Sequence, residues 1–420
     1  MKIISSGFSG SKSHVVAGVS IGLVMVLALL SPSAAMAIVN PNAYVSNNSA
    51  GTVTVINSTT NAIVTTISGF TAPTGLVMTI DGTKVYVVNN GANTVSVVNT
   101  ATNTIATTIP VGLSPQEVAA SPDGAHIYVT NQGGGSISVI NTATDTVSTT
   151  IAVGGLPASP AVTPDNAHVY VSDSSGTVKV IATATNTLSA TIVDPSFALP
   201  IPVAITPDGK TVYVGNLVAG SVSVINTATN TVTTTIPVGL IPFGLAVTPN
   251  GTTLYVANSG SGTISVVATA TNTVGSTIIE ALSDGPEGMA VTGDGAKLFL
   301  ANTGSDSVAV IATATNTISA TVQEPLASTP SFVALQVPQP AQPPNPCPVD
   351  DDKDRHHKKH HHHDGDGDHE RDSDRDHDDN NSDKNDCDQN NDSDRDHHDG
   401  DHHDDGDHHD DGDHHDGDSF

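Results

Sequence analysis

The chain repeats one short pattern seven times at a nearly constant spacing. In each copy an aromatic residue is followed by two small or branched residues and then by Asn or Asp; the aromatic residues are Tyr44, Tyr86, Tyr128, Tyr170, Tyr213, Tyr255 and Phe299. The spacings between them are 42, 42, 42, 43, 42 and 44 residues. A fixed period of this length is typical of a repeat architecture, and it constrains the fold more than any other feature of the chain.

One copy shows how each unit is built. Residues 244–248 form a short apolar run, and Pro249-Asn250-Gly251 has the composition of a tight turn before a second run at 253–257. Residues 263–267 alternate with period two, and a fourth run follows at 273–278. Val, Ile and Thr, which suit a pleated surface, predominate. Four antiparallel strands in about 42 residues are typical of one blade of a β-propeller.

The two ends of the repeat region indicate how the array closes. The first copy begins at its second strand, at Tyr44, whereas residues 331–337 match the first strands of other copies, such as 76–79. Each blade is apolar on both faces, so a row of blades has to close into a ring. We therefore predict an all-β, seven-bladed propeller of four-stranded antiparallel blades over residues 38–337, with the C-terminal strand completing blade one and covering the free edges.

These units resemble the YVTN-type β-propeller repeat. The resemblance rests on the Tyr-Val-x-Asn pattern, the Pro-Asp-Gly turn and the Val-x-Val-Ile-Asn-Thr-Ala-Thr-Asn run, and it extends from residue 43 to about 337. Gly293-Asp294-Gly295 and Phe299-Leu300 depart from it. The resemblance implies a propeller, and an exported or cell-surface protein, but no particular activity.

The residues that follow the loop proline of each unit are the candidates for ligand contact, because propellers usually bind ligands where the loops between blades converge on the central channel. Two such residues in each of the seven units give fourteen positions, and the candidates among them are Gln116, Glu117, Phe243, Glu287 and Phe332. Two of the fourteen are carboxylates and none is His, Cys, Arg or Lys. A hydrolase or metal-dependent lactonase needs a convergent set of acids, bases or ligands. We therefore predict no catalytic residues; Glu117 and Glu287, acting as acid and base across the channel, are the alternative.

Two further sets of polar residues recur at equivalent places. His126 and His168 lie just before the aromatic residue of adjacent units, which suits an ordinary edge position better than a shared metal site. The amide or carboxylate that ends each pattern could form a ligand collar, but its presence in every blade favours hydrogen bonding to its own loop. These residues are Asn47, Asn89, Asn131, Asp173, Asn216, Asn258 and Asn302.

The first 37 residues have the pattern of a secretory signal peptide. Lys2 and Lys12 precede an apolar run from Val15 to Leu30, and small residues at Ala35 and Ala37 follow it. The run is shorter than the ~20 residues that span a bilayer, so cleavage near Ala37 is favoured over an uncleaved anchor. We therefore expect an exported mature protein without a transmembrane span.

The C-terminal region differs completely from the repeats. Residues 338–348 are rich in proline, which predicts a stiff, extended linker. Residues 349–420 contain 29 acidic residues, 8 basic residues and 16 histidines, a net charge of −21, with almost nothing apolar, which predicts a disordered tail. The net charge of the whole chain, −29, makes unspecific nucleic-acid binding unlikely to be its role.

The tail carries the pattern of a divalent-metal module. Neutral imidazole suits Zn, Ni and Cu, and carboxylate oxygen suits Ca. The alternative is a tail that only solvates the protein. The candidate metal ligands are His360, His361, His362, His363, Asp364, Asp366, Asp368, His397, His398, His402, His403, His408, His409, His414 and His415.

Cys347 and Cys387 flank the first half of the tail. Export permits a disulfide, and an intramolecular bond is favoured over intermolecular pairing or ligation of a soft metal.

Together these features predict an exported propeller that acts as a binding or surface-interaction protein, with divalent cations and a protein or cell-surface polymer as partners. One alternative is an enzyme of lactonase-like or oxidoreductase type with its site in the central channel. Another is a structural component of a surface layer.

Overall fold

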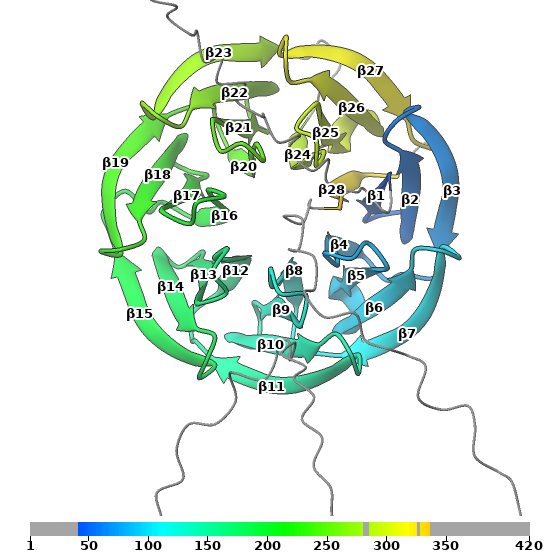
Figure 1. Ribbon diagram of the computed structural model, residues 1–420, viewed down its shortest axis with the longest axis horizontal. Coiled ribbons are helices and arrows are strands. Elements are labelled where there is room, and N and C mark those ends of the chain that lie inside the picture. The colour runs from blue at the N-terminus through cyan, green and yellow to red at the C-terminus, as the bar shows by residue number, and fades with distance from the viewer. Residues whose placement is uncertain (1–40, 280–284, 326–327, 337–420) are drawn as a thin grey trace, which may run out of the picture. The chain divides into compact units, whose positions relative to one another are not determined.

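The computed structural model describes residues 41–279, 285–325 and 328–336, which form a ring of seven four-stranded antiparallel sheets (Figure 1). The predicted seven-bladed propeller is therefore confirmed. The predicted signal peptide, linker and tail lie outside the described residues, and so do Cys347, Cys387 and all the candidate metal ligands of the tail.

The blades are numbered along the chain, and each runs from an innermost strand beside the ring axis to an outermost strand on the rim. Blade one contains β28, β1, β2 and β3, and blades two to seven contain β4–β7, β8–β11, β12–β15, β16–β19, β20–β23 and β24–β27. The innermost strands are β28 (Pro330–Ala334), β4 (Pro73–Met78), β8 (Pro115–Ala120), β12 (Pro157–Val162), β16 (Pro200–Ile205), β20 (Pro242–Val247) and β24 (Pro286–Val291). The second strands are β1 (Asn42–Asn47), β5 (Lys84–Asn89), β9 (His126–Asn131), β13 (His168–Asp173), β17 (Thr211–Asn216), β21 (Thr253–Asn258) and β25 (Lys297–Asn302).

The third strands are β2 (Thr52–Asn57), β6 (Thr94–Asn99), β10 (Ser136–Asn141), β14 (Thr177–Ala182), β18 (Ser221–Asn226), β22 (Thr263–Ala268) and β26 (Ser307–Ala312). The outermost strands are β3 (Ala62–Ser68), β7 (Thr104–Pro110), β11 (Thr146–Ala152), β15 (Thr187–Val193), β19 (Thr231–Pro237), β23 (Thr273–Ile279) and β27 (Thr317–Gln323). Short 3-10 helices, η1 (Asn90–Ala92) and η2 (Thr303–Ser305), follow β5 and β25.

The core lies between neighbouring blades. The second and third strands are buried along nearly their whole length, whereas the outermost strands are mostly exposed. One apolar cluster joins Tyr44 and Val55 of blade one to Val85 and Val87 of blade two, and similar clusters join the other neighbours. Because both faces of a middle strand are covered, Val and Ile fill both sides instead of alternating with polar residues.

The ring closes where the predicted C-terminal strand joins blade one. In β28 Ala334 pairs with Tyr44, and Val333 pairs with Val45. The strand is shorter than the predicted segment 331–337: it ends at Ala334, and residue 337 lies outside the described residues.

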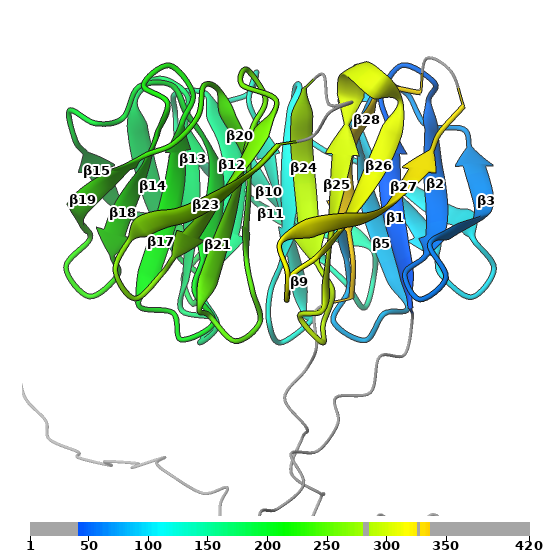
Figure 2. The ribbon, with the colours of Figure 1, turned by 90° about the horizontal axis from the view of Figure 1, so that it is seen from above.

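The ring has two faces, which Figure 2 shows from the side. One face, which we call the loop face, carries the loops that lead from one blade to the next and the loops between second and third strands. The turns between first and second strands, such as residues 79–83, lie on the opposite turn face.

Candidate functional site

Each innermost strand begins at a proline and has a β-bulge directly after it. In blade three Pro115 pairs with Asn131 and Val118 pairs with Val129, so Gln116 and Glu117 lie opposite a single residue. The same shift follows the proline of every other innermost strand. A bulge re-aims side chains, so the predicted ligand-contact positions lie together at the loop-face ends of the innermost strands. We call this set the channel mouth: Thr74, Gly75, Gln116, Glu117, Ala158, Ser159, Ile201, Pro202, Phe243, Gly244, Glu287, Gly288, Ser331 and Phe332.

Two phenylalanines in the channel mouth form a pair. The ring centroids of Phe243 in blade six and Phe332 in blade one are 6.5 Å apart, and the ring planes are tilted by 55°. Both side chains are half-buried, whereas all other Tyr and Phe side chains of the described residues are buried. One edge of Phe332 contacts the cluster between blades one and two. The part of the chain that the structure describes therefore keeps its only half-buried Phe or Tyr rings at the channel mouth.

Glu287 lies in blade seven, between the blades that carry these two rings. Its neighbours on both sides are close: a Cβ at Gly244 would overlap the Glu287 carbonyl oxygen, and a Cβ at Gly288 would lie 2.6 Å from Phe332 Cα. Both positions therefore require glycine. The Glu287 side chain is half-buried, and burial raises its pKa to about 7, although a hydrogen bond from Thr303 opposes the shift.

Glu117 lies in blade three, on another part of the channel mouth. Burial raises the pKa of its side chain to about 7, and a hydrogen bond from Ser159 of blade four opposes the shift. The Glu117 amide donates to Thr130 Oγ1 at 3.1 Å, and this hydroxyl donates to the Ala158 carbonyl at 2.6 Å. Glu117 and Glu287 thus owe their raised pKa values to burial rather than to each other, and an acid–base pair between them remains a hypothesis.

The rest of the channel mouth adds neutral hydrogen-bonding groups. Thr74 Oγ1 donates to the Gln116 carbonyl at 2.7 Å, and Gln116 Nε2 donates to Gln132 Oε1 at 3.3 Å. Ser331 Oγ donates to the Thr329 carbonyl at 3.2 Å. The site therefore combines hydroxyl, amide and carboxyl groups with two phenyl rings.

The recurring Asn residues have the structural role that their repetition predicts, and they also have further partners. Asn47 Nδ2 donates to Thr54 Oγ1 at 2.8 Å and to Thr52 Oγ1 at 3.2 Å, both in the third strand of the same blade. Asn89, Asn131, Asn216 and Asn258 donate to Ser and Thr hydroxyls in the same way. The expected bonds to the loop backbone are present at Asn89, Asn258 and Asp173, which accept from loop amides, and the hydroxyl groups of the neighbouring strand are additional partners of the Asn residues.

Blade four replaces this arrangement with an ion pair. Lys179 Nζ lies 3.6 Å from Asp173 Oδ2, and Asp173 is fully buried. Burial alone would raise the pKa of Asp173, but hydrogen bonds from Ser175 and Leu156 and the charge of Lys179 outweigh it, and the pKa is lowered. Blade four therefore has Asp173 where the other blades have Asn, and Lys179 where most of them have Ser or Thr, so the two changes occur together.

His126 and His168 are half-buried at the turn-face ends of β9 and β13, as expected for edge positions. Within the described residues, no group of three or more His, Cys, Asp or Glu side chains is placed to bind a metal ion.

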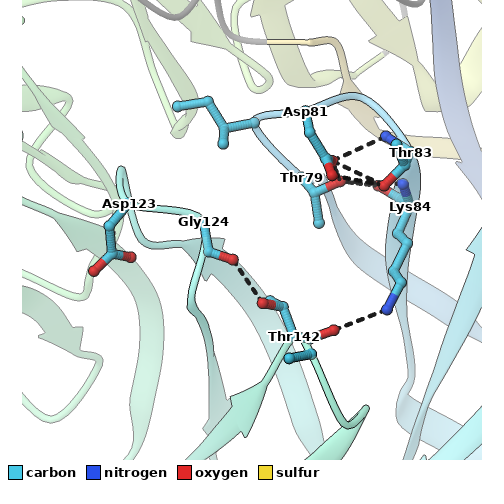
Figure 3. A pocket seen from close by; sticks show the side chains of 9 residues that line it. Thr79, Asp81, Thr83, Lys84, Asp123, Gly124 and Thr142 are labelled. Atoms are coloured by element: carbon cyan, nitrogen blue, oxygen red, sulfur yellow. Dashed lines mark hydrogen bonds between the residues drawn. The ribbon is translucent and has the colours of Figure 1, made fainter. Parts of the chain in front are cut away.

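Grooves on the turn face recur around the ring. One, of about 420 Å³, is lined by Asp81, Lys84, Asp123 and Thr142 (Figure 3). Lys84 Nζ donates to the Thr142 carbonyl at 2.8 Å and also pairs with Asp145 at 2.8 Å. An equivalent groove of about 460 Å³ lies between blades five and six. Since the groove is a product of the repeat, we assign it to the architecture rather than to a specific ligand.

Sequence reasoning missed Glu324, which lies directly after β27 at the junction of blades seven and one. Its side chain is buried, and Oε2 accepts a 2.6 Å hydrogen bond from Thr54 Oγ1. Burial raises its pKa, and the charge of Asp306 adds to the effect. The sequence does not single it out: the equivalent residues Val111 and Val153 are apolar, but Asp194 and Glu280 at the same place in other blades are acidic.

The fold and the site define this protein as a seven-bladed β-propeller whose channel mouth carries polar and aromatic side chains. The family described as "Lactonase, 7-bladed beta-propeller" matches residues 176–292, which is well under half of the chain. The match agrees with the fold, and the resemblance to the YVTN repeat remains a prediction. No match was found among curated proteins.

Several solved structures share the fold at low identity. Hydrazine synthase of Kuenenia stuttgartiensis is 22% identical, with a TM-score of 0.61, over 65% of this chain and 93% of its own. A functionally unknown protein of Desulfotomaculum acetoxidans DSM 771 is 18% identical, with a TM-score of 0.63, over 71% of this chain and 100% of its own. A putative 6-phosphogluconolactonase of Bacteroides uniformis ATCC 8492 is 18% identical, with a TM-score of 0.59, over 70% of this chain and 98% of its own.

Among the described residues there is no helix of the length and hydrophobicity needed to cross a membrane.

Proposed function

We propose that the protein is an exported binding protein in which the propeller presents the channel mouth and the C-terminal tail binds divalent cations. The observation that supports binding over catalysis is the composition of the channel mouth. It holds two separate carboxyl groups among hydroxyl, amide and phenyl groups, and no Lys, Arg, His or Cys. Such a site can bind and orient a ligand. Its one contact between a hydroxyl and a carboxyl group, Ser159 with Glu117, has no His or Lys beside it.

The positions of the cationic side chains support the same proposal. In the described residues, Lys84 and Lys297 lie at the turn-face ends of β5 and β25, Lys210 lies next to β17, and Lys179 is paired with Asp173. None belongs to the channel mouth, so a phosphorylated sugar lactone would have no positive partner there.

The tail supports the metal part of the proposal through its composition alone. Its histidines occur in pairs separated by Asp and Gly, which offers many imidazole and carboxylate ligands in a short length of chain. Cation binding would bring the propeller to an anionic cell-surface polymer or would buffer the ions themselves.

The test is a calorimetric titration of the full chain with Zn, Ni, Cu and Ca. A matched variant changes the twelve histidines among the candidate ligands (His360, His361, His362, His363, His397, His398, His402, His403, His408, His409, His414 and His415) to Ser and keeps every Asp. We expect several Zn, Ni or Cu ions to bind the wild type and far fewer to bind the variant, with Ca uptake unchanged. Equal uptake of Zn by both chains would contradict the proposal. Light scattering in the same titration separates a monomeric binder from a protein that assembles into a layer.

Lactone hydrolysis is a second candidate function. Two observations favour it: the lactonase family match spans residues 176–292, and Glu287, inside that span, has a pKa near the value that suits a general base. The test measures hydrolysis of an uncharged sugar δ-lactone by the full chain and by Glu287→Gln. Loss of about a hundredfold or more in rate in the variant would support this candidate, and equal rates would exclude it.

A further inference from the structure

We propose that Phe243, Glu287 and Phe332 form a binding site for a neutral hydroxylated ring, such as one hexose unit of a carbohydrate. The inference deepens the proposed binding function by giving the chemical class of the propeller's ligand, and it rests on that function.

The first argument is the placement of the aromatic rings. Burial of a phenyl or phenol ring is among the most favourable contributions a side chain makes, and this chain has only 3% aromatic residues. The six tyrosines and the phenylalanines Phe70, Phe197 and Phe299 are buried between blades. Of the Phe and Tyr rings in the described residues, the two that remain half-buried, Phe243 and Phe332, lie at the bulges of equivalent strands and contact each other. Accessible rings grouped at a channel mouth suit stacking against the C–H face of a sugar.

The second argument is the polar group on the blade that lies between those of the two rings. Glu287 comes from the bulge of blade seven, whose backbone contacts the bulges of blades six and one. With a pKa of about 7, its carboxyl group can either donate to a sugar hydroxyl or accept from one. The Thr303 hydroxyl hydrogen-bonds the Glu287 carboxyl group and also lies 2.9 Å from the Pro330 carbonyl, and its single proton goes to one of these two acceptors at a time. A few placed polar groups beside apolar rings are the usual composition of a small-molecule site.

The third argument is charge. The channel mouth has no cationic side chain, so a phosphate or carboxylate on the ligand would be bound without a partner. An organic cation is the competing ligand, because aromatic rings and a carboxylate also attract ammonium groups. Burial raises the pKa of Glu287 to about 7, so at neutral pH its carboxyl group carries less negative charge than an exposed glutamate and attracts a cation less strongly.

The test uses the full chain and saturation-transfer difference NMR, which detects weak binding. The probes are the neutral disaccharides maltose and cellobiose, with glucose 6-phosphate and tetramethylammonium as charged comparisons, each at about 10 mM to detect Kd values in the millimolar range. We expect saturation transfer to a neutral disaccharide and none to the charged probes.

Variants locate the site. Phe243→Ala should weaken disaccharide binding at least tenfold, whereas Leu240→Ala should leave it unchanged. Leu240 is a suitable control because it lies in the loop just before β20 and is 63% exposed. Glu287→Gln retains a donor and an acceptor and should weaken binding less than Glu287→Ala. If Phe243→Ala does not fold, Phe243→Leu replaces it, since it keeps apolar volume and removes the ring.

Three outcomes would overturn the proposal: no transfer to either disaccharide from the wild type, undiminished transfer in the folded Phe243 variant, or transfer to tetramethylammonium alone. The metal titration reports on the tail and this experiment on the channel mouth, so each proposal can fail while the other stands.

Discussion

The hydroxyl of Tyr44 donates a 2.7 Å hydrogen bond to Oδ1 of Asn103, which lies one blade further around the ring. Asn103 is in the left-handed backbone region, with φ of 52°, at the turn between β6 and β7. Asn tolerates this conformation and also offers an acceptor, so one residue shapes the turn and joins two blades. The contact recurs for Tyr86 with Asp145, Tyr170 with Asn230, Tyr213 with Asn272 and Tyr255 with Asn316.

The first prediction tests this contact. Tyr255→Phe removes the 2.6 Å hydrogen bond to Asn316 and should lower the free energy of unfolding by about 1 kcal/mol. The measurement is denaturant unfolding followed by circular dichroism. Tyr128→Phe is the matched control, because Asn186 Oδ1, the acceptor equivalent to Asn316, has no hydrogen-bond partner in the described structure. Equal losses in both variants would show that the hydroxyl contact between blades is not the cause.

The second prediction concerns Asp173 and Lys179. Lys179→Ser leaves a buried carboxylate without its ion-pair partner and should cost about 1–3 kcal/mol of stability. The double variant Asp173→Asn with Lys179→Ser recreates the Asn–Ser arrangement of other blades and should return to within about 1 kcal/mol of the wild type. The check is a double-mutant cycle by denaturant unfolding. Additive losses in the cycle would contradict a coupled pair.

The third prediction is a pH dependence that arises from Glu117. In the folded protein its pKa is raised from 4.5 to about 7, so the folded state keeps a proton that the unfolded chain releases. Stability is therefore lost as pH rises from about 4.5 through about 7, and the loss is complete above that range. Glu117→Gln cannot ionise. Relative to the wild type it should gain about 1–3 kcal/mol between pH 4 and pH 8.

The measurement for Glu117 is the unfolding free energy of both proteins at several pH values. Asp208→Asn serves as a control, because the pKa of the Asp208 carboxyl is lowered by hydrogen bonds from Thr206 and Lys210. That variant should lose stability relative to the wild type as pH rises from acid to neutral. A pH-independent difference between Glu117→Gln and the wild type would be inconsistent with the raised pKa.

The fourth prediction tests the close approach of blades six and seven. Gly244→Ala places a methyl group against the Glu287 carbonyl oxygen and should destabilise the protein by about 1–3 kcal/mol. Gly275→Ala is the control, since its nearest neighbour is the Val266 carbonyl oxygen at 3.8 Å, and it should be neutral or slightly stabilising. Thermal unfolding of the two variants checks this. A neutral Gly244→Ala would mean that the two bulges separate easily.

The repeat made most of the fold predictable, because each copy is an independent sample of the same strand pattern. The segment that includes Phe332 could be assigned to blade one because it resembles the other innermost strands. The bulges were not predicted: the run in blade six was expected to begin at Gly244, whereas β20 begins at Pro242 and includes the extra residue Phe243. A single extra residue near the start of a six-residue strand does not produce a recognisable change in its pattern of apolar and polar residues.

The candidate site was predictable in position but not in its contacts. The residues after the loop prolines were expected at the channel, and they lie at one end of the innermost strands. The contact between Phe243 and Phe332 joins blades six and one across blade seven. It forms because the curvature of the ring brings these two blades close together at the channel, and the sequence does not show this curvature. Lys84 and Asp145 are likewise 61 residues apart and meet only because adjacent blades lie side by side.

The pairing of β28 with β1 also determines when the ring can form during synthesis. Three strands of blade one are made first, and their missing partner is nearly the last described segment to be made. Until Ala334 has emerged, Tyr44 and Val45 lack the strand that covers them, and blade seven lacks its next neighbour. A nascent chain of six complete blades therefore exposes the unpaired edge of β1 and part of the apolar face of blade seven, so a chain cut short before residue 330 would be a target for proteolysis.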